Sequence, residues 1–577
     1  MGNVISNVSH PQFDLGGGVI GGIAPAGGVY PLSLALTTAG RLGFYIDYSE
    51  LTAASTHKFY ICRTHGTSGA VSVTYTTSGD DHTSVTGSVA WADGDASIHV
   101  VDVPVTAGNL STHDAAGLGE HRITMQLSAP TGSAVLHHES YSRAYGVIDN
   151  ATMIASDANA VFYDSAAGAG TGTQASPYNN FYTAMTAMGS KRYFYGKGTS
   201  TVDSTNLGFG ATYTLPVPTS RAGEATRAYV RNWPAATWTV TGTGTDKAGF
   251  YTLSGEDYHT YRGIDFSALD SSSQANGFGI FYHSGNSSGI NIELCTADDI
   301  NGGNANNGAY MVWGVDGAKV WRCTSNNIQK IGDNTNENTA GIFSYTGKNI
   351  SVQRCEATAS NSLIYHKEVG TAFDATASVR FCIDSTLVGI HFGGSGSASV
   401  PHSYTVVQGN LFKANAGIGI YHNTGVPGTN GTTNAAKHWW AGNVFDGRGA
   451  GENAAIHGRQ SYEAGVFNNI MNNCRKVWAD YQDTTAYGAV FEFADYNNEY
   501  GTTLTSERYE WKGVDYTTAA ALFTAGGYAA NDVNGDPVFT NTATNDYTLA
   551  TGSASIGAGV GGTDCGIYLT KQEVIGA

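Results

Sequence analysis

The stretch NIELCTADD occupies residues 291–299, and variants of it return as VWRCTSNNI at 320–328 and SVQRCEATA at 351–359. Related nine-residue segments begin at residues 259, 378, 405 and 439. A small residue recurs in these segments at intervals of 27 to 33 residues, as Gly263, Cys295, Cys323, Cys355, Cys382, Gly409 and Gly442. A strand unit that cannot bury its apolar face alone, and so stacks on copies of itself, produces such a period. The repeat therefore predicts a right-handed parallel β-helix.

Four of the seven cysteines share this one column, and the chain contains no CxxC pair. Free cysteine is among the most buried residue types. We therefore interpret the column as a stack of small buried thiols rather than as a zinc site or a disulfide framework. Asn410 and Asn443 follow two glycines of the column and are candidates for an asparagine ladder at the turn.

Two further segments complete the predicted organisation. Residues from about 35 to 150 alternate polar and apolar side chains, as in 71–75 and 123–127, which is typical of a β-sandwich. Ser176 is the expected N-cap of a short capping helix with Pro177 in its first turn. The buried face of this helix should carry Phe181, Ala184, Met185 and Met188. We divide the chain into a Gly-rich arm at 1–34, a β-sandwich at 35–152 and an all-β solenoid at 153–577 that ends in closing rungs.

Composition and charge exclude several kinds of partner. The net charge is −18, so duplex nucleic acid is not expected, because its phosphates are contacted by Lys and Arg. No apolar run is long enough to span a bilayer, and the first residues lack the basic and apolar regions of a secretory signal. The Gly-rich arm is either a flexible extension or a segment that attaches the protein to a partner.

A second repeated strand carries the side chains best suited to binding or catalysis. It reads GIFSYTG at 341–347, LIYHKEV at 363–369 and GIYHNTG at 419–425. We expect the anchors that point into the solenoid to be Ile280, Ala309, Ile342, Ile364, Ile390, Ile420 and Ile456. Strand side chains alternate, so the next residue and the one two further on face outward. This outward set includes His283, Tyr310, Tyr345, Tyr365, Lys367, His391, Tyr421, His457 and Arg459.

Stacked rungs should bring these aromatic, His, Lys and Arg side chains side by side on one face. Sugars bind such surfaces, because aromatic rings contact their C–H faces and polar groups bind their hydroxyls. The alternative is an ordinary solvated sheet face with outward aromatics. Aromatic side chains that gather on one exposed face favour a binding site.

Two parts of the chain resemble known families. The segments VSVTYTTSGDD, EHRITMQLSAPTGSAVL and YGVIDN, between residues 71 and 150, resemble a Calx-β domain. That resemblance implies a calcium site, of which Asp149 and Asn150 keep only part, so no cofactor is expected, with calcium as the alternative. The opening VFYDSAAGAGTGTQASPYNNFYTAM at 161–185 and the ending NGDPVFTNTATNDYTLATGSASIGAGVGGTDCGIYL at 534–569 are similar to the two ends of pectate-lyase-like β-helices. This resemblance, to the polysaccharide lyase and phage tailspike type, implies a β-helix that engages a polysaccharide.

The reaction has to be inferred from the residues, because this fold hosts lyases, hydrolases, epimerases and pure binders. A lyase that cleaves a uronate polymer must neutralise a carboxylate, remove the C5 proton and protonate the leaving oxygen. Lys or Arg can neutralise the carboxylate, and Lys, His or Tyr can transfer the protons. The expected catalytic residues are Lys367, His391, Tyr365 and Arg459. The expected substrate-binding residues are Tyr345, Tyr421, His457, Tyr310 and His283.

The step from Lys367 to His391 is similar to the Lys-then-Arg arrangement of β-helical alginate and chondroitin lyases, with His391 in place of the Arg. Hydrolysis would instead require two carboxylates about 5 to 9 Å apart. The candidates are Asp298, Asp299, Asp333, Glu337 and Asp384, although Asp is also a favoured turn residue.

We therefore expect a carbohydrate-binding β-helix protein that acts as a virion-associated, tailspike-like depolymerase and is a lyase rather than a hydrolase. The alternatives are a non-catalytic virion or adhesion protein that binds host glycan and a secreted bacterial polysaccharide lyase. The expected partners are a polysaccharide or cell-surface glycan, other virion proteins through the N-terminal arm, and further copies of the chain in a homotrimer. The expected location is the virion or the extracellular space.

Overall fold

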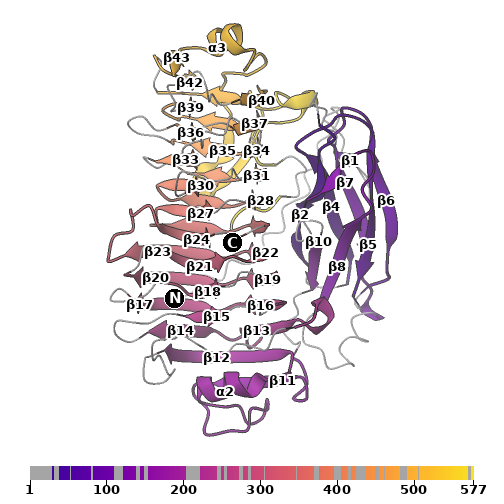
Figure 1. Cartoon of the computed structure of the whole chain (residues 1–577), viewed down its shortest axis with the longest axis vertical. Helices are drawn as coiled ribbons and strands as arrows, with labels where there is room; N and C mark the ends of the chain where they lie inside the picture. Colours follow the sequence, from indigo (N-terminus) through magenta and orange to yellow (C-terminus); the bar gives the residue numbers. More distant parts are fainter. Residues whose placement is uncertain are drawn as a thin grey trace.

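The protein consists of a β-sandwich that lies alongside a tall stack of parallel strands (Figure 1). The computed structural model describes residues 29–30, 38–51, 54–79, 82–108, 121–137, 143–148, 154–202, 221–242, 249–252, 257–271, 277–283, 288–303, 306–345, 347, 349–368, 376–394, 404–413, 417–423, 436–448, 454–459, 462–480, 490–503, 506–511, 513–568 and 573–577. Apart from 29–30, the predicted arm at 1–34 lies outside these residues, as do Asp149 and Asn150.

The β-sandwich contains two five-stranded, mainly antiparallel sheets. One sheet has the order β1 (Val29–Tyr30), β7 (Ile98–Pro104), β4 (Thr56–Thr64), β2 (Arg41–Ile46) and β9 (Val135–Leu136). The other has the order β3 (Tyr48–Leu51), β10 (Arg143–Ile148), β8 (His121–Ser128), β5 (Val71–Ser78) and β6 (Thr86–Trp91). Along β5, Val71 and Val73 are buried while Ser72 and Thr74 are half-exposed. The alternation read from the sequence is therefore confirmed, because alternate side chains enter the core between the sheets.

The rest of the chain forms a parallel β-helix with three faces. Face I contains β11 (Ala160–Asp164), β12 (Tyr193–Val202), β13 (Ala228–Asn232), β16 (His259–Arg262), β19 (Ser288–Glu293), β22 (Asp316–Trp321), β25 (Ile350–Gln353), β28 (Thr376–Arg380), β31 (Tyr404–Gln408), β34 (Ala436–Ala441), β37 (Tyr462–Phe467) and β40 (Val490–Asp495). Face II contains β14 (Trp238–Gly242), β17 (Asp265–Ser271), β20 (Thr296–Gly302), β23 (Thr324–Lys330), β26 (Glu356–Thr358), β29 (Ile383–Ser385), β32 (Leu411–Phe412), β35 (Val444–Asp446), β38 (Ile470–Asn472) and β41 (Asn498–Tyr500). Together they form one bent sheet of 22 strands.

Face III is a separate sheet of 11 strands that runs the length of the solenoid. It contains β15 (Phe250–Thr252), β18 (Ile280–His283), β21 (Asn307–Trp313), β24 (Thr339–Tyr345), β27 (Ser362–Glu368), β30 (Val388–Gly394), β33 (Ile418–Asn423), β36 (Ile456–Arg459), β39 (Trp478–Asp480), β42 (Tyr509–Trp511) and β43 (Val514–Tyr516). All neighbours in it are parallel except β42 and β43.

A residue in the left-handed conformation directly follows the face I strand in nine successive turns, from the turn of β16 to the turn of β40. This bend is occupied by Gly263, Leu294, Arg322, Arg354, Phe381, Gly409, Gly442, Asn468 and Tyr496, with φ between 48° and 70°. The buried column follows directly as Ile264, Cys295, Cys323, Cys355, Cys382, Asn410, Asn443, Asn469 and Asn497. The predicted alignment of the three glycines with the cysteines is therefore wrong by one residue. Glycine is suited to the bend because it adopts positive φ without steric cost.

The cysteine column continues as an asparagine ladder in the later rungs. All seven cysteines are buried and free, which confirms the packing interpretation of the column. The side-chain oxygen of Asn443 accepts from the backbone N–H and the side-chain amide of Asn410, both at 3.0 Å. The Asn469 side-chain oxygen accepts the same pair of hydrogen bonds from Asn443, and the Asn497 side-chain oxygen accepts the same pair from Asn469. Asp532 ends the ladder by accepting from the Asn497 backbone N–H at 2.8 Å.

A short helix covers each end of the solenoid (Figure 1). Helix α2 (Phe181–Met188) lies at the start, and its four buried residues are the four predicted ones. Its N-cap is Asn180, whose side chain accepts from the Thr183 backbone N–H at 2.8 Å, so the assignment of Ser176 as the N-cap is wrong. Asn competes well with Ser at this position, because its side-chain oxygen satisfies a free N–H of the first turn. Helix α3 (Ala519–Gly526) lies near the opposite end.

The C-terminal segment does not add the closing rungs that the sequence predicted. Strands β44 (Phe539–Asn541) and β45 (Asp546–Leu549) pair only with each other and are antiparallel. Three 3-10 turns are described, at Glu224–Thr226, Thr542–Thr544 and Val560–Gly562. The segment turns back along the flank of the solenoid, where an apolar cluster combines Ile383, Leu411, Val444, Ile470, Tyr547, Cys565 and Ile567. The chain therefore ends at mid-height of the solenoid rather than at its tip (Figure 1).

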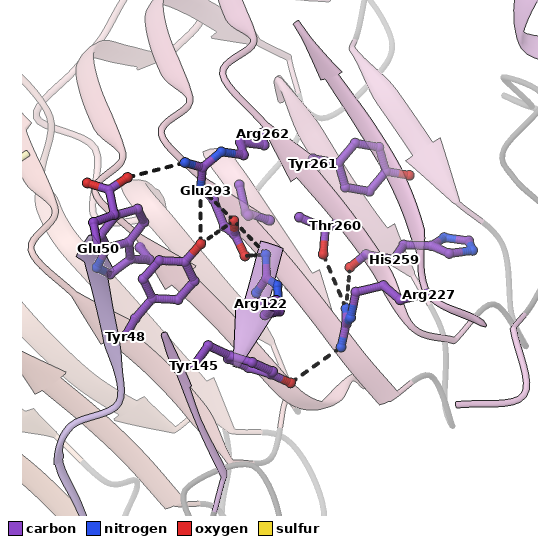
Figure 2. A network of polar contacts seen from close by, with 12 residues as sticks. Tyr48, Glu50, Arg122, Tyr145, Arg227, His259, Thr260, Tyr261, Arg262 and Glu293 are labelled. Carbon is purple, nitrogen blue, oxygen red and sulfur yellow. Dashed lines mark hydrogen bonds and ion pairs between the residues drawn. The ribbon is translucent and has the colours of Figure 1, made fainter. Parts of the chain in front are cut away.

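The β-sandwich is joined to face I by a buried network of charges that the sequence did not reveal (Figure 2). The Glu293 carboxylate accepts from Tyr48 at 2.5 Å, from Arg122 at 3.0 Å and from Arg262 at 3.0 Å. Arg262 also pairs with Glu50 at 3.2 Å. Both arginines and Glu293 are fully or almost fully buried. Each charge has an opposite partner, so the desolvation of the network is offset by pairing within it.

A second buried contact lies further along the same face. The Lys319 ammonium pairs with Asp47 at 2.6 Å, and Ser351 donates to the same carboxylate at 2.5 Å. Beside them, the Tyr48 ring stacks on Trp321 with centroids 3.8 Å apart. These contacts span several turns of the solenoid, so the sandwich covers face I and leaves face III uncovered by it (Figure 1).

Candidate functional site

The outward side chains of face III were predicted to form the functional site, and the strand register tests this arrangement directly. The inward column consists of Ile280, Tyr310, Ile342, Ile364, Ile390, Ile420 and Ile456, which pair rung by rung. Each inward isoleucine is 0 or 1% exposed. The outward positions are therefore the residue after each anchor and the residue two further on, as the alternation requires.

Tyr310 is an inward residue, and its prediction as a substrate-binding residue is wrong. It replaces Ala309 as the anchor of β21, is 1% exposed, and donates its hydroxyl to the Thr324 carbonyl at 2.9 Å. A tyrosine fits this core position because the hydroxyl finds an acceptor inside the solenoid. The outward residues of β21 are instead Met311 and Trp313.

One row of outward residues forms a continuous aromatic ladder, which we call the inner row. It consists of Phe343, Tyr365, His391, Tyr421 and His457. The centroid distances between successive rings are 5.2, 4.1, 4.8 and 5.3 Å. The register therefore brings four of the predicted site residues into direct contact, one on each successive rung.

The second row, which we call the outer row, lies two residues further along each strand. Its described side chains are Trp313, Tyr345 and Lys367, followed by Gly393. The Trp313 and Tyr345 rings lie 4.2 Å apart. Backbone pairing places His283 before Trp313 and Arg459 three rungs after Lys367, but the side chains of both lie outside the described residues.

The two rows differ in accessibility, which the sequence did not predict. Tyr365 is 6% exposed and His391 and His457 are each 4% exposed, because the rings of the inner row cover one another. Tyr345, Lys367 and Tyr421 are half-buried. A ligand on this face would therefore contact mainly the outer row and the edges of the inner row.

Lys367 lies at the centre of the site. Its ammonium donates to the Asn338 side chain at 3.2 Å and lies 5.5 Å from the centre of the Tyr365 ring. Burial lowers the pKa of Lys367, and the carboxylate of Glu337 opposes this effect. Glu337 itself is exposed. Lys367 thus provides a partly dehydrated positive charge with a carboxylate beside it, in the loop between β23 and β24.

Tyr365 is held in its protonated form. Burial raises the pKa of Tyr365 above its ordinary value, and Glu337, Tyr421 and Tyr345 add smaller effects in the same direction. Burial also raises the pKa of Tyr345. A phenol in this state is suited to donating a proton or a hydrogen bond rather than to acting as a base.

Gly393 lies next to Lys367 in the outer row, and the Tyr365 and His391 rings occupy the volume above its backbone. A Cβ atom at this position would lie 2.8 Å from the Tyr365 ring and 3.0 Å from both the Tyr365 hydroxyl and His391 Nε2. These two polar atoms therefore converge on the same point above the Gly393 backbone. Sequence alone could not show this convergence, because glycine has no side chain that marks the outward position.

The inward histidine of β27 is a core residue, as its position in the sequence suggested. His366 is 1% exposed and is hydrogen-bonded to Ser344 at 2.9 Å. Burial lowers the pKa of His366 to about 4. The neutral imidazole therefore belongs to the packing of the solenoid and not to the outward face.

Four of the five carboxylates that hydrolysis would require are engaged by other groups. Asp298 and Asp299 each accept from an asparagine of the next rung, at 2.7 and 2.5 Å. Asp384 is buried in an ion pair with Arg448. Asp333 accepts from Thr335 within its own turn. Of the five predicted carboxylates, only Glu337 lies beside the residues of face III.

The described ranges contain neither a cluster of metal-ligating side chains nor a membrane-spanning helix. Among these residues, no group of three or more His, Cys, Asp and Glu side chains is placed to hold a metal ion. The partial calcium motif at Asp149 and Asn150 lies outside them. In the described part of the chain, no helix has the length and apolar character needed to cross a bilayer.

Comparison with known proteins extends to part of the chain only. No protein-family profile and no curated protein sequence matches it. Solved structures of Calx domains are similar to about a fifth of the chain. The apo-form Calx CBD1 domain is 17% identical, with 19% of this chain and 97% of that chain covered and a TM-score of 0.16. The Calx CBD2 domain is 13% identical, with 20% and 88% covered and a TM-score of 0.16.

The third structure, CBD12 from CALX1.2, is 16% identical, with 19% of this chain and 44% of that chain covered and a TM-score of 0.16. These values assign no activity to the protein. The strand topology itself defines the fold, which is a parallel β-helix preceded by a β-sandwich.

Proposed function

We propose that face III binds a polysaccharide and that the protein is a depolymerase of a surface glycan, acting as a lyase rather than as a hydrolase. The observation that carries this proposal is the arrangement of Lys367, Tyr365 and His391. A partly buried ammonium, a phenol with a raised pKa and an imidazole lie on two successive rungs beside a row of aromatic rings. This set of groups matches the three tasks of uronate elimination.

The roles follow from the chemistry of each group. The Lys367 ammonium pairs with the uronate carboxylate and so makes the C5 proton more acidic. Imidazole titrates near neutral pH and is suited to remove that proton, which is the role of His391. Tyr365, whose raised pKa keeps it protonated, donates to the leaving oxygen. Arg459 is a further carboxylate partner, on the strand three rungs further on.

The aromatic side chains supply the binding surface. Trp313, Tyr345 and Tyr421 are half-buried, so part of each ring faces outward and is available to the C–H face of a sugar. His457 extends the inner row beyond Tyr421, and His283 occupies the outward position of β18 on the other side. The resemblance of the two ends of the solenoid to polysaccharide-lyase and tailspike β-helices supports the same class of ligand.

A second candidate function is binding without cleavage. The low exposure of Tyr365 and His391 favours it, because groups that transfer protons to a substrate need access to that substrate. In both cases we propose a virion-associated or extracellular protein. Its arm at 1–34 attaches it to other virion proteins, and the chain assembles as a homotrimer, as tailspikes do.

Product analysis separates these functions. The protein is incubated with alginate, pectin, and bacterial capsular and extracellular polysaccharides. Absorbance of an unsaturated uronate supports a lyase, whereas new reducing ends without that absorbance support a hydrolase. Binding without either product supports the second candidate. If no polysaccharide on a broad panel is bound or cleaved, the proposed function is wrong.

A further inference from the structure

The spacing of charges along the outer row carries information about the ligand of face III. Successive rungs of a parallel sheet lie about 4.8 Å apart, so a glycan chain that follows the solenoid axis meets one outer-row position after another. Along this row, Trp313 and Tyr345 are neutral, Lys367 is cationic, and Gly393 has no side chain. Among the described side chains of the row, the positive charge is therefore confined to one rung.

The surroundings of that charge do not favour additional anionic groups. Glu337 is exposed and directly precedes Asn338, whose side chain accepts from the Lys367 ammonium at 3.2 Å. A second carboxylate of a ligand in this region would be repelled by Glu337, because like charges at short range disfavour each other. The net charge of −18 adds a repulsive background.

The positions before Lys367 are suited to uncharged sugars. The Trp313 and Tyr345 rings are in contact at 4.2 Å, and both are half-buried. A carboxylate placed against them would lose water without gaining a charged partner, which is costly. A neutral sugar would instead bury its C–H face on the rings.

We infer that the glycan bound by face III is sparsely charged, with one acidic sugar at Lys367 and neutral sugars over Tyr345 and Trp313. This inference rests on the proposed function and deepens it, because it specifies the class of polysaccharide. The ligand is a heteropolysaccharide with isolated uronate or other carboxylate groups. A homopolymer with a carboxylate on every sugar fits the row poorly.

The binding of three soluble oligosaccharides of equal length tests the inference. An alginate oligomer carries a carboxylate on every sugar, a hyaluronan oligomer on every second sugar, and a gellan oligomer on every fourth sugar. Titrations are performed at pH 8, above the ordinary range of imidazole, so that the histidines of the inner row add no charge. We expect the affinity to rise from alginate through hyaluronan to gellan. The affinities for alginate and gellan should differ by about tenfold or more, which is the effect of one unpaired charge near a surface.

Two variants test whether Lys367 and Glu337 cause this order of affinities. Lys367→Met should remove the preference for gellan over an uncharged glucan oligomer. Glu337→Gln should raise the affinity for alginate more than that for gellan, because it removes the repelling carboxylate. Lys58→Met is the matched control, since it removes one lysine charge from the sandwich, where Lys58 forms an exposed pair with Asp102 at 2.9 Å.

The outcomes separate the inference from the function on which it rests. Tighter binding of alginate than of gellan, with Lys367→Met weakening both, overturns the sparse-charge inference and leaves glycan binding on face III intact. A ranking that Lys58→Met changes as much as Lys367→Met does also overturns it. Binding of none of the oligosaccharides, together with no binding on the polysaccharide panel, contradicts the proposed function as a whole.

Discussion

The Tyr365 ring lies flat against the His391 imidazole of the next rung, with the centroids 4.1 Å apart and the planes at an angle of 2°. This stack joins a phenol whose pKa is raised by burial to an imidazole. Its geometry is set by the register of β27 and β30, in which Tyr365 pairs with His391. The stack therefore has a structural role and a chemical role, which different substitutions can separate.

Tyr365→Phe removes the hydroxyl but keeps the ring and its contact with His391. If Tyr365 protonates the leaving oxygen, product formation should fall by about a hundredfold or more, the usual contribution of a general acid. Affinity for the glycan should change little, because the ring remains. Unsaturated-uronate absorbance and a binding titration measure the two effects. Full cleavage activity in the variant would exclude Tyr365 as the proton donor.

Gly393→Ala tests the convergence of Tyr365 and His391 above the Gly393 backbone. The new Cβ would meet the Tyr365 ring at 2.8 Å and His391 Nε2 at 3.0 Å, so both rings must move. We expect lower activity and a loss of about 1–3 kcal/mol in the free energy of unfolding, as for overpacking of a well-packed site. Gly465→Ala is the control, because its Cβ would meet no atom closer than 3.6 Å. Equal effects of the two variants on activity and stability would show that the lack of a side chain at position 393 is not required for the arrangement of Tyr365 and His391.

The carboxyl group of Asp532, at the end of the asparagine ladder, should make the free energy of unfolding depend on pH. Burial is the largest cause that raises the pKa of Asp532, to about 6, and neighbouring Asp495 adds to it. The folded state therefore binds more protons than the unfolded state between about pH 4 and 6, so the free energy of unfolding should fall as the pH rises through this window. Asp532→Asn keeps an acceptor for Asn497 and removes the charge. It should stabilise the protein at pH 8 by about 1–3 kcal/mol and have little effect near pH 4.

Chemical denaturation at pH 4 and pH 8 measures this change. Asp333→Asn is a control with the opposite sign, because hydrogen bonds from Thr335 lower the pKa of Asp333. The stabilisation that Asp333 gives is present above its unfolded pKa and lost as the pH falls through its folded pKa. Equal unfolding midpoints for wild type and Asp532→Asn at pH 8 would contradict the role of the Asp532 charge.

Glu293 is the shared acceptor at the contact between the sandwich and the solenoid (Figure 2). Glu293→Gln leaves Arg122 and Arg262 buried without this carboxylate, and breaking a buried pair in this way costs about 3–5 kcal/mol. Limited proteolysis should then cleave between the sandwich and the solenoid more readily than in wild type. Lys58→Met, which breaks only an exposed ion pair with Asp102, should cost less than about 1 kcal/mol. Wild-type stability of Glu293→Gln would contradict a stabilising role of the network.

The solenoid could be predicted from the sequence because its period is visible in the chain, whereas the fine alignment could not. A pattern of small residues does not distinguish Gly263, which lies at the left-handed bend, from Cys295, which lies one position after the bend of its own turn. The bend also has no sequence signature in the turns where Leu294 or Phe381 occupies it. Tyr310 was misplaced for a similar reason. Ala309 precedes it at the position expected for the anchor, and only the carbonyl of Thr324 explains why a tyrosine is buried there.

The strand register confirms the predicted grouping of outward residues on face III, but their detailed contacts could not be predicted. Alternation along β27 and β30 was enough to place Tyr365, Lys367 and His391 together. Sequence alone could not show that Tyr365 and His391 would cover each other, or that Glu337, in a loop between two other strands, would lie beside Lys367. The charges that join the sandwich to face I were missed as well, because Asp47 and Lys319 are 272 residues apart and neither belongs to a motif.

The most direct test of glycan binding on face III is a comparison of wild type with the double variant Tyr345→Ala/Lys367→Met. Both proteins are applied to a broad glycan array, and the affinity for the best-bound glycan is then measured in solution. We predict that the double variant keeps the wild-type melting temperature and loses affinity by about tenfold or more. Wild-type affinity in a correctly folded double variant would contradict the assignment of face III as the binding surface.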